Sequence, residues 1–240
     1  MTYDVIIVGG GAAGFFAAIQ IAQADPSLHL IILEKGNDVL GKVRISGGGR
    51  CNVTHAEFIP NELAKNYPRG EQELRGPFHT FCSGDTVDFF EKRGVSLKIE
   101  EDGRMFPESD SSESIINCFR DECRRLGVEV LTNRGVKTIL RYQNYWELDT
   151  SGGTYRCRKL LLATGSSQKV WRMLSNMGHT IVDPVPSLFT FNIKDPRIKG
   201  LQGLSTFAGV SIPGTGLEAE GPVLITHWGM SGPAILRLSA

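Results

Sequence analysis

The stretch Val5–Ala18, VIIVGGGAAGFFAA, decides the fold class. A run of four apolar residues ends in three glycines, which is typical of a strand buried on both faces of a parallel sheet. Good helix formers follow over Ala12–Gln23, and a second apolar run, Leu28–Leu33, ends at Glu34. Strand, helix and strand within 34 residues predict a βαβ unit and therefore an α/β fold with a parallel sheet.

The glycines of this stretch fit the dinucleotide-binding pattern G-x-G-x-x-G. In this pattern Gly9 makes the tight turn, Gly11 lets the backbone approach a pyrophosphate, and Gly14 lets the helix pack closely on the strand. The helix N-terminus supplies N–H groups and partial positive charge for the phosphates. Glu34, 20 residues after Gly14, can accept hydrogen bonds from ribose hydroxyls, which favours FAD or NAD over NADP. The alternative is a glycine turn in an ordinary α/β protein.

A second glycine motif is a coincidental match. Residues 36–42, GNDVLGK, fit the start of a phosphate-binding Walker A loop. Val43 stands where that loop needs a hydroxyl to hold Mg²⁺, and we expect loop rather than helix after Lys42. The segment therefore does not indicate an NTPase.

Composition limits the class of protein. The 240 residues carry 26 basic and 26 acidic side chains, so the whole chain has no strongly basic footprint for nucleic acid, although a local basic face is compatible with this balance. No signal peptide, membrane-spanning run or zinc-type Cys/His cluster is visible, and we predict a cytoplasmic protein without metal. The cysteines form no CxxC pair, which favours reduced thiols over a disulfide framework: Cys51, Cys82, Cys118, Cys123 and Cys157.

The rest of the chain predicts two parts. Apolar periodicity and glycine stops predict helices at 61–66, 85–93, 113–126 and 169–177. Strands are predicted at 97–99, 128–131 and 160–163, with a three-stranded meander at 136–140, 145–149 and 155–157. From Asp183 prolines separate short apolar runs, which indicates a β-rich unit. We therefore expect an FAD-binding domain over 1–187 and the start of an inserted, substrate-side domain over 188–240.

Five segments in this order resemble the BaiN/YhiN-like flavoprotein family, also described as aminoacetone-oxidase-like. They are the opening stretch, GKVRISGGGRCNVTH (41–55), EEDGRMFPESD (100–110), ATG (163–165) and GPVLITHWGMSGPAILRLSA (221–240). The block around ISGGGRCN is the most specific of them. The resemblance covers essentially the whole chain and implies FAD as the cofactor, with NAD(P)H as a possible transient co-substrate.

The resemblance also implies site residues. The loop after the βαβ unit would wrap the flavin side of FAD, with Lys42 and Arg50 supplying positive charge and Asn52 hydrogen bonds. Val136 would offer a backbone contact to the adenine. The full cofactor-binding set is Gly9, Gly11, Ala12, Ala13, Gly14, Glu34, Lys35, Lys42, Ser46, Gly47, Gly48, Arg50, Cys51, Asn52, Val136, Ala163, Thr164 and Gly165.

Other residues keep two interpretations. Cys51 is either redox-active or, as we favour, a small buried thiol that fills space under the loop. Within the family-like motif THWGMSGP, His227 could approach substrate, whereas His55 has no assigned role. The acidic and basic residues of the turn at 101–108 either line the substrate side or form a salt-linked turn. No catalytic residue is assigned.

Two features depart from the family pattern. Ser166–Lys169, SSQK, replaces the second glycine and the Ser/Tyr/Pro-rich turn that relatives carry. The chain also ends at Ala240, inside the inserted unit, so we expect a fragment that lacks the segment returning to the flavin.

The expected function is FAD-dependent oxidoreduction by hydride transfer through flavin N5. The family resemblance favours NAD(P)H-dependent reduction of a conjugated C=C bond in a small molecule. The alternatives are O₂-dependent oxidation of a small amine, reduction of uridine in ribosomal RNA, and a non-catalytic nucleotide-binding fragment. The oligomeric state stays open.

Overall fold

The protein divides into two compact units. The computed structural model describes residues 2–67 and 69–240. One unit comprises the chain up to Pro60 together with Pro77–Ile181, and the other comprises Asn61–Gly76 together with Val182–Ala240. The predicted functional domains, 1–187 and 188–240, stay predictions.

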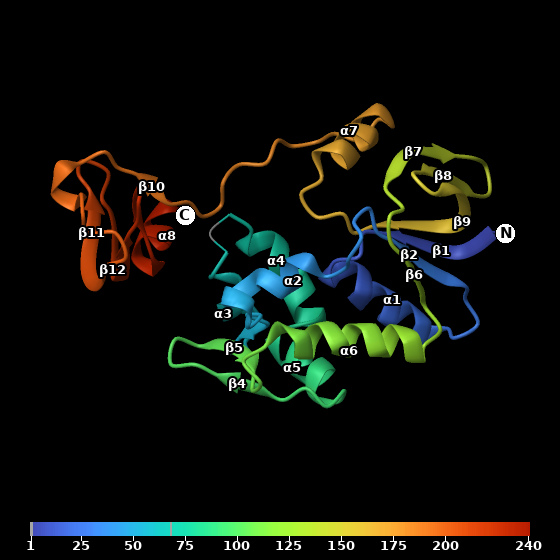
Figure 1. Cartoon of the computed structure of the whole chain (residues 1–240), viewed down its shortest axis with the longest axis horizontal. Helices are drawn as coiled ribbons and strands as arrows, with labels where there is room; N and C mark the ends of the chain where they lie inside the picture. Colours follow the sequence, from blue (N-terminus) through green and yellow to red (C-terminus); the bar gives the residue numbers. More distant parts are fainter. Residues whose placement is uncertain (1, 68) are drawn as a thin grey trace. The chain divides into compact units, whose positions relative to one another are not determined.

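The first unit carries the βαβ start of the chain. Its elements begin with strand, helix and strand, as the sequence predicts, and continue with further helices and strands that complete the unit (Figure 1). They are β1 (Thr2–Val8), α1 (Ala12–Ala24), β2 (Leu30–Leu33), α2 (Gly41–Ile45), the 3-10 helix η1 (Ser46–Gly49), β3 (Thr54–His55), α5 (Ser83–Glu91), β4 (Leu97–Ile99), β5 (Arg104–Pro107), α6 (Ser112–Arg125), β6 (Glu129–Leu131), β7 (Val136–Arg141), β8 (Trp146–Thr150), β9 (Gly153–Leu162) and α7 (Gln168–Asn176).

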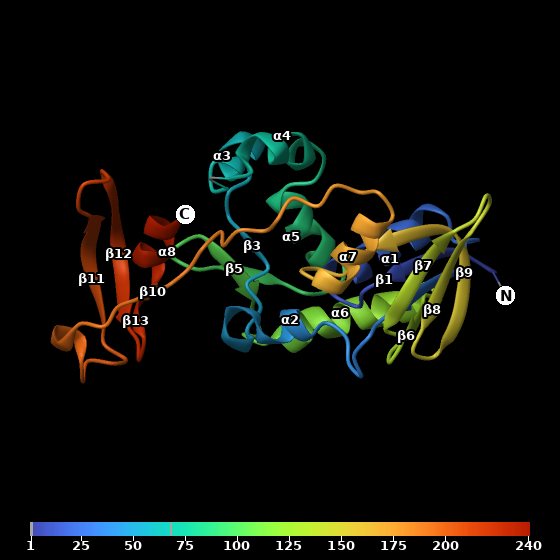
Figure 2. The ribbon, with the colours of Figure 1, turned by 90° about the horizontal axis from the view of Figure 1, so that it is seen from above.

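A six-stranded sheet organises this unit in the order β6-β2-β1-β9-β8-β7. β1 lies between β2 and β9 and runs parallel to both, with Val8 opposite Leu33 and Leu162. β7, β8 and β9 form an antiparallel meander (Figure 2). The predicted α/β fold with a parallel sheet and a meander is therefore confirmed.

The two faces of β1 pack against different elements because side chains alternate along a strand. Val5 and Ile7 belong to a core shared with helices α1, α5 and α6, including the fully buried Phe15. Ile6 and Val8 belong to a second core, which the meander and α7 supply. Each fully buried side chain of this size contributes about 1.5–3 kcal/mol. The turn after β1 is therefore anchored from both faces of the sheet.

The second unit is a small antiparallel sheet with helices. Its four strands lie in the order β10-β13-β12-β11, and α8 packs on β12 and β11 (Figure 1). The elements are β10 (Phe191–Asn192), η2 (Pro196–Ile198), β11 (Ser205–Ile212), β12 (Leu217–Ile225), β13 (Gly229–Ser231) and α8 (Pro233–Ser239), together with most of α3 (Pro60–Ala64) and α4 (Glu71–Thr80). The strands that follow Asp183 agree with the β-rich unit that the prolines indicate.

Three local predictions were wrong. The strands predicted at 155–157 and 160–163 are one strand, β9, since its pairing with β1 before and after Arg158 keeps the chain extended between them. The glycine-rich region 36–84, which we expected to be irregular apart from one short helix at 61–66, also contains α2 and α4. Helix α2 also begins at Gly41, where loop was expected, but its Val43 side chain is buried and carries no hydroxyl.

The described residues contain neither a helix that could span a membrane nor a cluster of metal ligands. None of their helices has the length and apolar character needed to cross a membrane. In the same residues, no group of three His, Cys, Asp or Glu side chains could hold a metal ion.

Candidate functional site

The turn between β1 and α1 is held by backbone contacts. A Cβ added at Gly9 would lie 2.3 Å from the Ala163 carbonyl oxygen and 3.2 Å from the Thr164 Cα. One added at Gly14 would lie 2.0 Å from the Gly9 carbonyl oxygen. The backbone itself fills these spaces, so neither position accepts a side chain without movement.

Gly11 differs from these two glycines. A Cβ at this position would meet nothing within 4 Å, and its φ of −91° suits any residue. Protein packing therefore does not require glycine here, whereas a ligand lying against the backbone would. Gly11 is also the N-cap of α1, and no side chain caps this helix. Its first N–H groups and the positive end of its dipole thus face open space, which suits an anion.

Glu34 links the end of β2 to this turn. Its Oε2 accepts a hydrogen bond from the Gly10 N–H at 2.7 Å, and its Oε1 accepts one from the Gly36 N–H at 2.8 Å. Each carboxylate oxygen can accept a further bond, so the predicted bond to a ribose hydroxyl stays a prediction. Lys35 is exposed beside Gly135. Val136, which follows Gly135 in the sequence, is buried, and its carbonyl accepts a hydrogen bond from the Lys169 Nζ at 2.8 Å.

Lys42 lies at the same edge of the sheet. Its Nζ lies 3.4 Å from the Ser166 Oγ and 3.8 Å from the Cβ position of Gly165. The Ala163 N–H donates to the Val8 carbonyl at 2.8 Å, which sets this turn beside the end of β1. Among the described residues no carboxylate pairs with Lys42. Its charge is therefore available to an anionic ligand.

Arg50 has carboxylate partners instead. Its guanidinium pairs with Glu100 and with Asp110 and lies 4.0 Å over the Phe106 ring. The hydrogen bond to Glu100 is the main cause that raises the pKa of Arg50. Arg104 joins the same network through Glu100 and Asp102. Within the turn at 101–108, Asp102 and Arg104 are thus salt-linked, which favours the structural interpretation for these two residues.

Cys51 lies in a left-handed conformation with a φ of +65° and is buried. Burial raises the pKa of its thiol, so the reactive thiolate is disfavoured near neutral pH. Its N–H donates to the Ser46 carbonyl at 3.0 Å, which closes the SGGG turn. These contacts favour the space-filling interpretation of Cys51 over the redox one.

A cavity of about 530 Å³ gathers these elements. Ala12 and Ala13 from α1, Lys42 from α2, and Ser46, Cys51 and Asn52 from the following loop line it. Its apolar floor was missed by the sequence analysis. Five phenylalanines from α1, α5, α6 and the segment before α5 form this floor: Phe16, Phe81, Phe89, Phe90 and Phe119.

These rings pack on one another. The centroid of Phe89 lies 5.0 Å from that of Phe16 and 5.9 Å from that of Phe119. The doublets at 15–16 and 89–90 were a visible signal in the sequence, but sequence spacing cannot show that rings on separate helices converge. We call the space above them, with the residues that line it, the α1 cavity.

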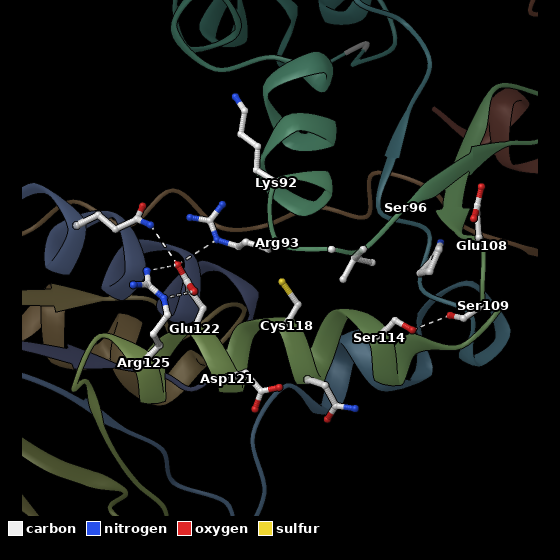
Figure 3. A pocket seen from close by; sticks show the side chains of 15 residues that line it. Lys92, Arg93, Ser96, Glu108, Ser109, Ser114, Cys118, Asp121, Glu122 and Arg125 are labelled. Atoms are coloured by element: carbon white, nitrogen blue, oxygen red, sulfur yellow. Dashed lines mark hydrogen bonds and ion pairs between the residues drawn. The ribbon is translucent and has the colours of Figure 1, made fainter.

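A larger groove of about 1050 Å³ lies elsewhere in the first unit (Figure 3). Its central charges are paired: the Glu122 carboxylate lies 3.3 Å from the Arg93 Nε and 2.8 Å from the Arg125 Nη2. Gln23 donates to the same carboxylate at 3.1 Å. Burial raises the pKa of Cys118 in its wall to about 11. This groove lies between α6 and the segments packed against it, and its lining shows no arrangement typical of a catalytic group.

The second unit holds a separate cavity of about 750 Å³. His227, which the sequence analysis set near the substrate, lines this cavity together with Trp228. His55, without a predicted role, lies 3.1 Å through its Nε2 from the Asp102 carbonyl.

Comparison with known proteins identifies the family. The family described as HI0933-like protein Rossmann domain matches residues 3–227. The chain belongs to this family. The HI0933-like family is the BaiN/YhiN-like flavoprotein family that the sequence motifs predicted, and it is a family of flavin-dependent oxidoreductases.

Two curated relatives match nearly all of the chain. One is a ribosomal RNA dihydrouridine synthase of Escherichia coli, 29% identical over 99% of this chain and 60% of that protein. The other is a 3-dehydro-bile acid delta(4,6)-reductase of Clostridium scindens, 28% identical over 97% of this chain and 59% of that protein. The chain thus spans about three fifths of the length of these relatives.

A solved structure supports the fold alone. The 3-ketosteroid-delta4-(5alpha)-dehydrogenase of Rhodococcus jostii superposes with a TM-score of 0.50 and 15% identity. The match covers 69% of this chain and 46% of that one. The family and the α/β fold are therefore established, whereas the roles of the individual cofactor-binding residues stay predictions.

Proposed function

We propose that the chain forms the dinucleotide-binding part of an FAD-dependent reductase that saturates a C=C bond conjugated to a carbonyl. The observation that carries this proposal is the α1 cavity, where an uncapped helix N-terminus, an unpaired cation and an apolar aromatic floor meet. These three features suit the charged and apolar parts of FAD.

The residues present fit the cofactor. Gly9 and Gly14 leave no room for side chains because backbone fills it, but the space beyond Gly11 is open. A pyrophosphate against Gly11 would accept hydrogen bonds from the first N–H groups of α1. Lys42 would neutralise part of its charge. The phenylalanine floor would exclude water from an apolar ring system lying above it.

The names of the relatives support the reaction class. A dihydrouridine synthase saturates the C=C bond of a uracil ring, and a delta(4,6)-reductase acts on C=C bonds of a 3-oxo steroid. In each substrate a carbonyl activates the bond toward hydride. FAD, when bound, would supply hydride-transfer chemistry once NAD(P)H has reduced it. Overall the C=C bond gains a hydride and a proton, and NAD(P)H is oxidised to NAD(P)⁺. Arg50 and the 101–108 turn would position the cofactor loop rather than react.

Uridine in RNA is a second candidate substrate. Two curated relatives with this name, from Escherichia coli and Haemophilus influenzae, match 99% and 98% of the chain. An oxo-steroid and a uridine within RNA differ in size, in polarity and in the charge of the phosphates beside the base, so the two substrates are readily distinguished in an assay. The same flavin chemistry would serve both.

The first experiment is an absorption spectrum of the purified chain supplied with FAD. We expect flavin bands that stay with the protein through gel filtration, and bleaching of these bands by NADH or NADPH under anaerobic conditions. Reoxidation by a conjugated enone or by a uridine oligonucleotide then identifies the substrate class. Reoxidation by O₂ coupled to amine consumption would overturn the reductase proposal. A chain that folds but never retains FAD would overturn the assignment of the α1 cavity.

A further inference from the structure

The cavity of the second unit lies beside the turn that joins β12 to β13. We call it the Trp228 cavity. It is lined by residues 192–196, 198, 199, 202 and 226–229, all from the second unit, and measures about 750 Å³. Seven of its twelve lining residues carry charged or hydrogen-bonding side chains other than the indole. Neither the family match nor the proposed function assigns it a ligand.

Trp228 is an exposed aromatic residue that is held in place. Its indole is 53% exposed, yet its Nε1 donates to the Thr190 Oγ1 at 3.2 Å. Its carbonyl accepts from the Ile193 N–H at 2.9 Å. Gly229 after it has a φ of +153°, and a Cβ there would lie 2.1 Å from the Phe191 carbonyl oxygen. The ring therefore has a defined position, and about half of the residue's surface is open to solvent, which leaves area for stacking.

The cations of this cavity are not compensated. No ion pair joins Lys194 or Lys199 to a carboxylate among the described residues. The one acidic side chain in the lining, Asp195, is bound by Arg197 at 2.7 Å and accepts from its backbone N–H at 2.8 Å. Arg197 therefore neutralises Asp195, and two lysine charges stay available beside Trp228.

Neutral polar groups complete the lining. Asn192 and Gln202 each carry an amide that both donates and accepts hydrogen bonds. The Thr226 hydroxyl already accepts from the Gly229 N–H at 3.1 Å, which shapes the turn. Amides beside an aromatic face are the groups that read the edges of an unstacked base.

We propose that the Trp228 cavity binds a single-stranded RNA segment. One base stacks on Trp228, flanking phosphates lie against Lys194 and Lys199, and the amides of Asn192 and Gln202 contact the base edge. An acidic peptide would use the lysines but not an aromatic face with amides around it. Binding itself is independent of FAD, and the inference rests on the proposed function only in treating this RNA as substrate.

The test is equilibrium binding of a fluorescein-labelled decauridylate, followed by anisotropy at several salt concentrations. Trp228→Ala should weaken binding by about 5- to 150-fold, the usual worth of one stacked base. The double variant Lys194→Ala/Lys199→Ala should reduce the slope of log K against log salt by about 1.4, for two lost phosphate contacts. Lys65→Ala is the matched control, since Lys65 is an exposed lysine of the same unit that pairs with Glu62 at 2.7 Å.

The outcomes are distinct from those of the flavin assay. Trp228→Phe keeps a stacking face and should bind more tightly than Trp228→Ala. Equal affinity of wild-type protein and all cavity variants, each folded by circular dichroism, would overturn the inference. Binding of an anionic steroid or an acidic peptide in place of decauridylate would overturn it as well. Flavin reduction without RNA binding would leave the proposed reductase intact and remove only this site.

Discussion

The two cavities are built from different parts of the chain. The α1 cavity rests on backbone and buried side chains: Gly9, Gly14 and the phenylalanine floor belong to the packing of the first unit. The Trp228 cavity is lined mostly by exposed and half-buried residues of the loops and turns that flank a small antiparallel sheet. Substitutions in the α1 cavity, except at Gly11 and Lys42, should therefore also change the stability of the fold. Side chains of the Trp228 cavity can be replaced one at a time without such an effect.

Gly14→Ala should have the largest effect of the variants considered, because it should destabilise the first unit itself. The new Cβ would lie 2.0 Å from the Gly9 carbonyl oxygen, which is fixed backbone at the end of β1. We expect destabilisation of about 3 kcal/mol or more, because helix and strand must separate. Thermal unfolding followed by circular dichroism measures this loss. An unchanged melting temperature would show that the turn is not part of the core.

Gly11→Ala should separate ligand binding from folding. Its Cβ would meet nothing within 4 Å, so the melting temperature should stay that of the wild type. The methyl group would occupy the space in which the pyrophosphate approaches the helix, and loss of two charged hydrogen bonds corresponds to about 100-fold weaker FAD binding. Isothermal titration with FAD checks this. A variant that binds FAD normally would exclude the predicted pyrophosphate position.

Lys42→Ala should have a smaller effect on the same ligand. Removal of one charged contact to a phosphate should weaken FAD about tenfold. Stability should be unaffected, since Lys42 is exposed and its Nζ makes a single hydrogen bond among the described residues, at 3.4 Å to the Ser166 Oγ. Arg50→Ala is the contrasting variant: it should lower the melting temperature, because Glu100 and Asp110 each lose one of the two cationic partners that the described residues give them and keep only Arg104 and Lys98, respectively. If Arg50→Ala weakened FAD binding and Lys42→Ala lowered the melting temperature instead, Arg50 would be the ligand-binding cation and Lys42 the stabilising one.

A rise in pH should lower the free energy of unfolding of the first unit more than that of the second, by a small amount. Burial raises the pKa of Cys118 and of Cys157 to about 11 and that of Cys123 to about 12, from 9.0. Each thiol stays protonated longer in the folded state, so its stabilising contribution is complete below pH 9 and is lost as the pH rises toward 11–12.

All cysteines belong to the first unit. Urea unfolding at pH 8 and pH 10, with the tryptophans of each unit as probes, should therefore show a loss in the first unit. Cys123→Ala should reduce the dependence on pH. A loss confined to the second unit would contradict this origin.

Local signals were sufficient for the start of the chain. The apolar run, the glycine spacing and Glu34 predicted β1, the turn, α1 and β2, because each depends on residues close in sequence. They were insufficient at β9. The two strands predicted there left out Arg158 and Lys159, but pairing with β1 on both sides of Arg158 keeps the strand continuous.

The sequence by itself determined the family, the βαβ unit and the place of the glycine turn, since strand and helix formation there follow from residue type and short spacing. Only the tertiary structure decided which charges are free. Arg50 and Lys42 look alike in sequence, but Arg50 meets Glu100, 50 residues away, while Lys42 meets no carboxylate among the described residues. The phenylalanine floor and the exposed face of Trp228 have the same origin, because burial and pairing depend on distance in space.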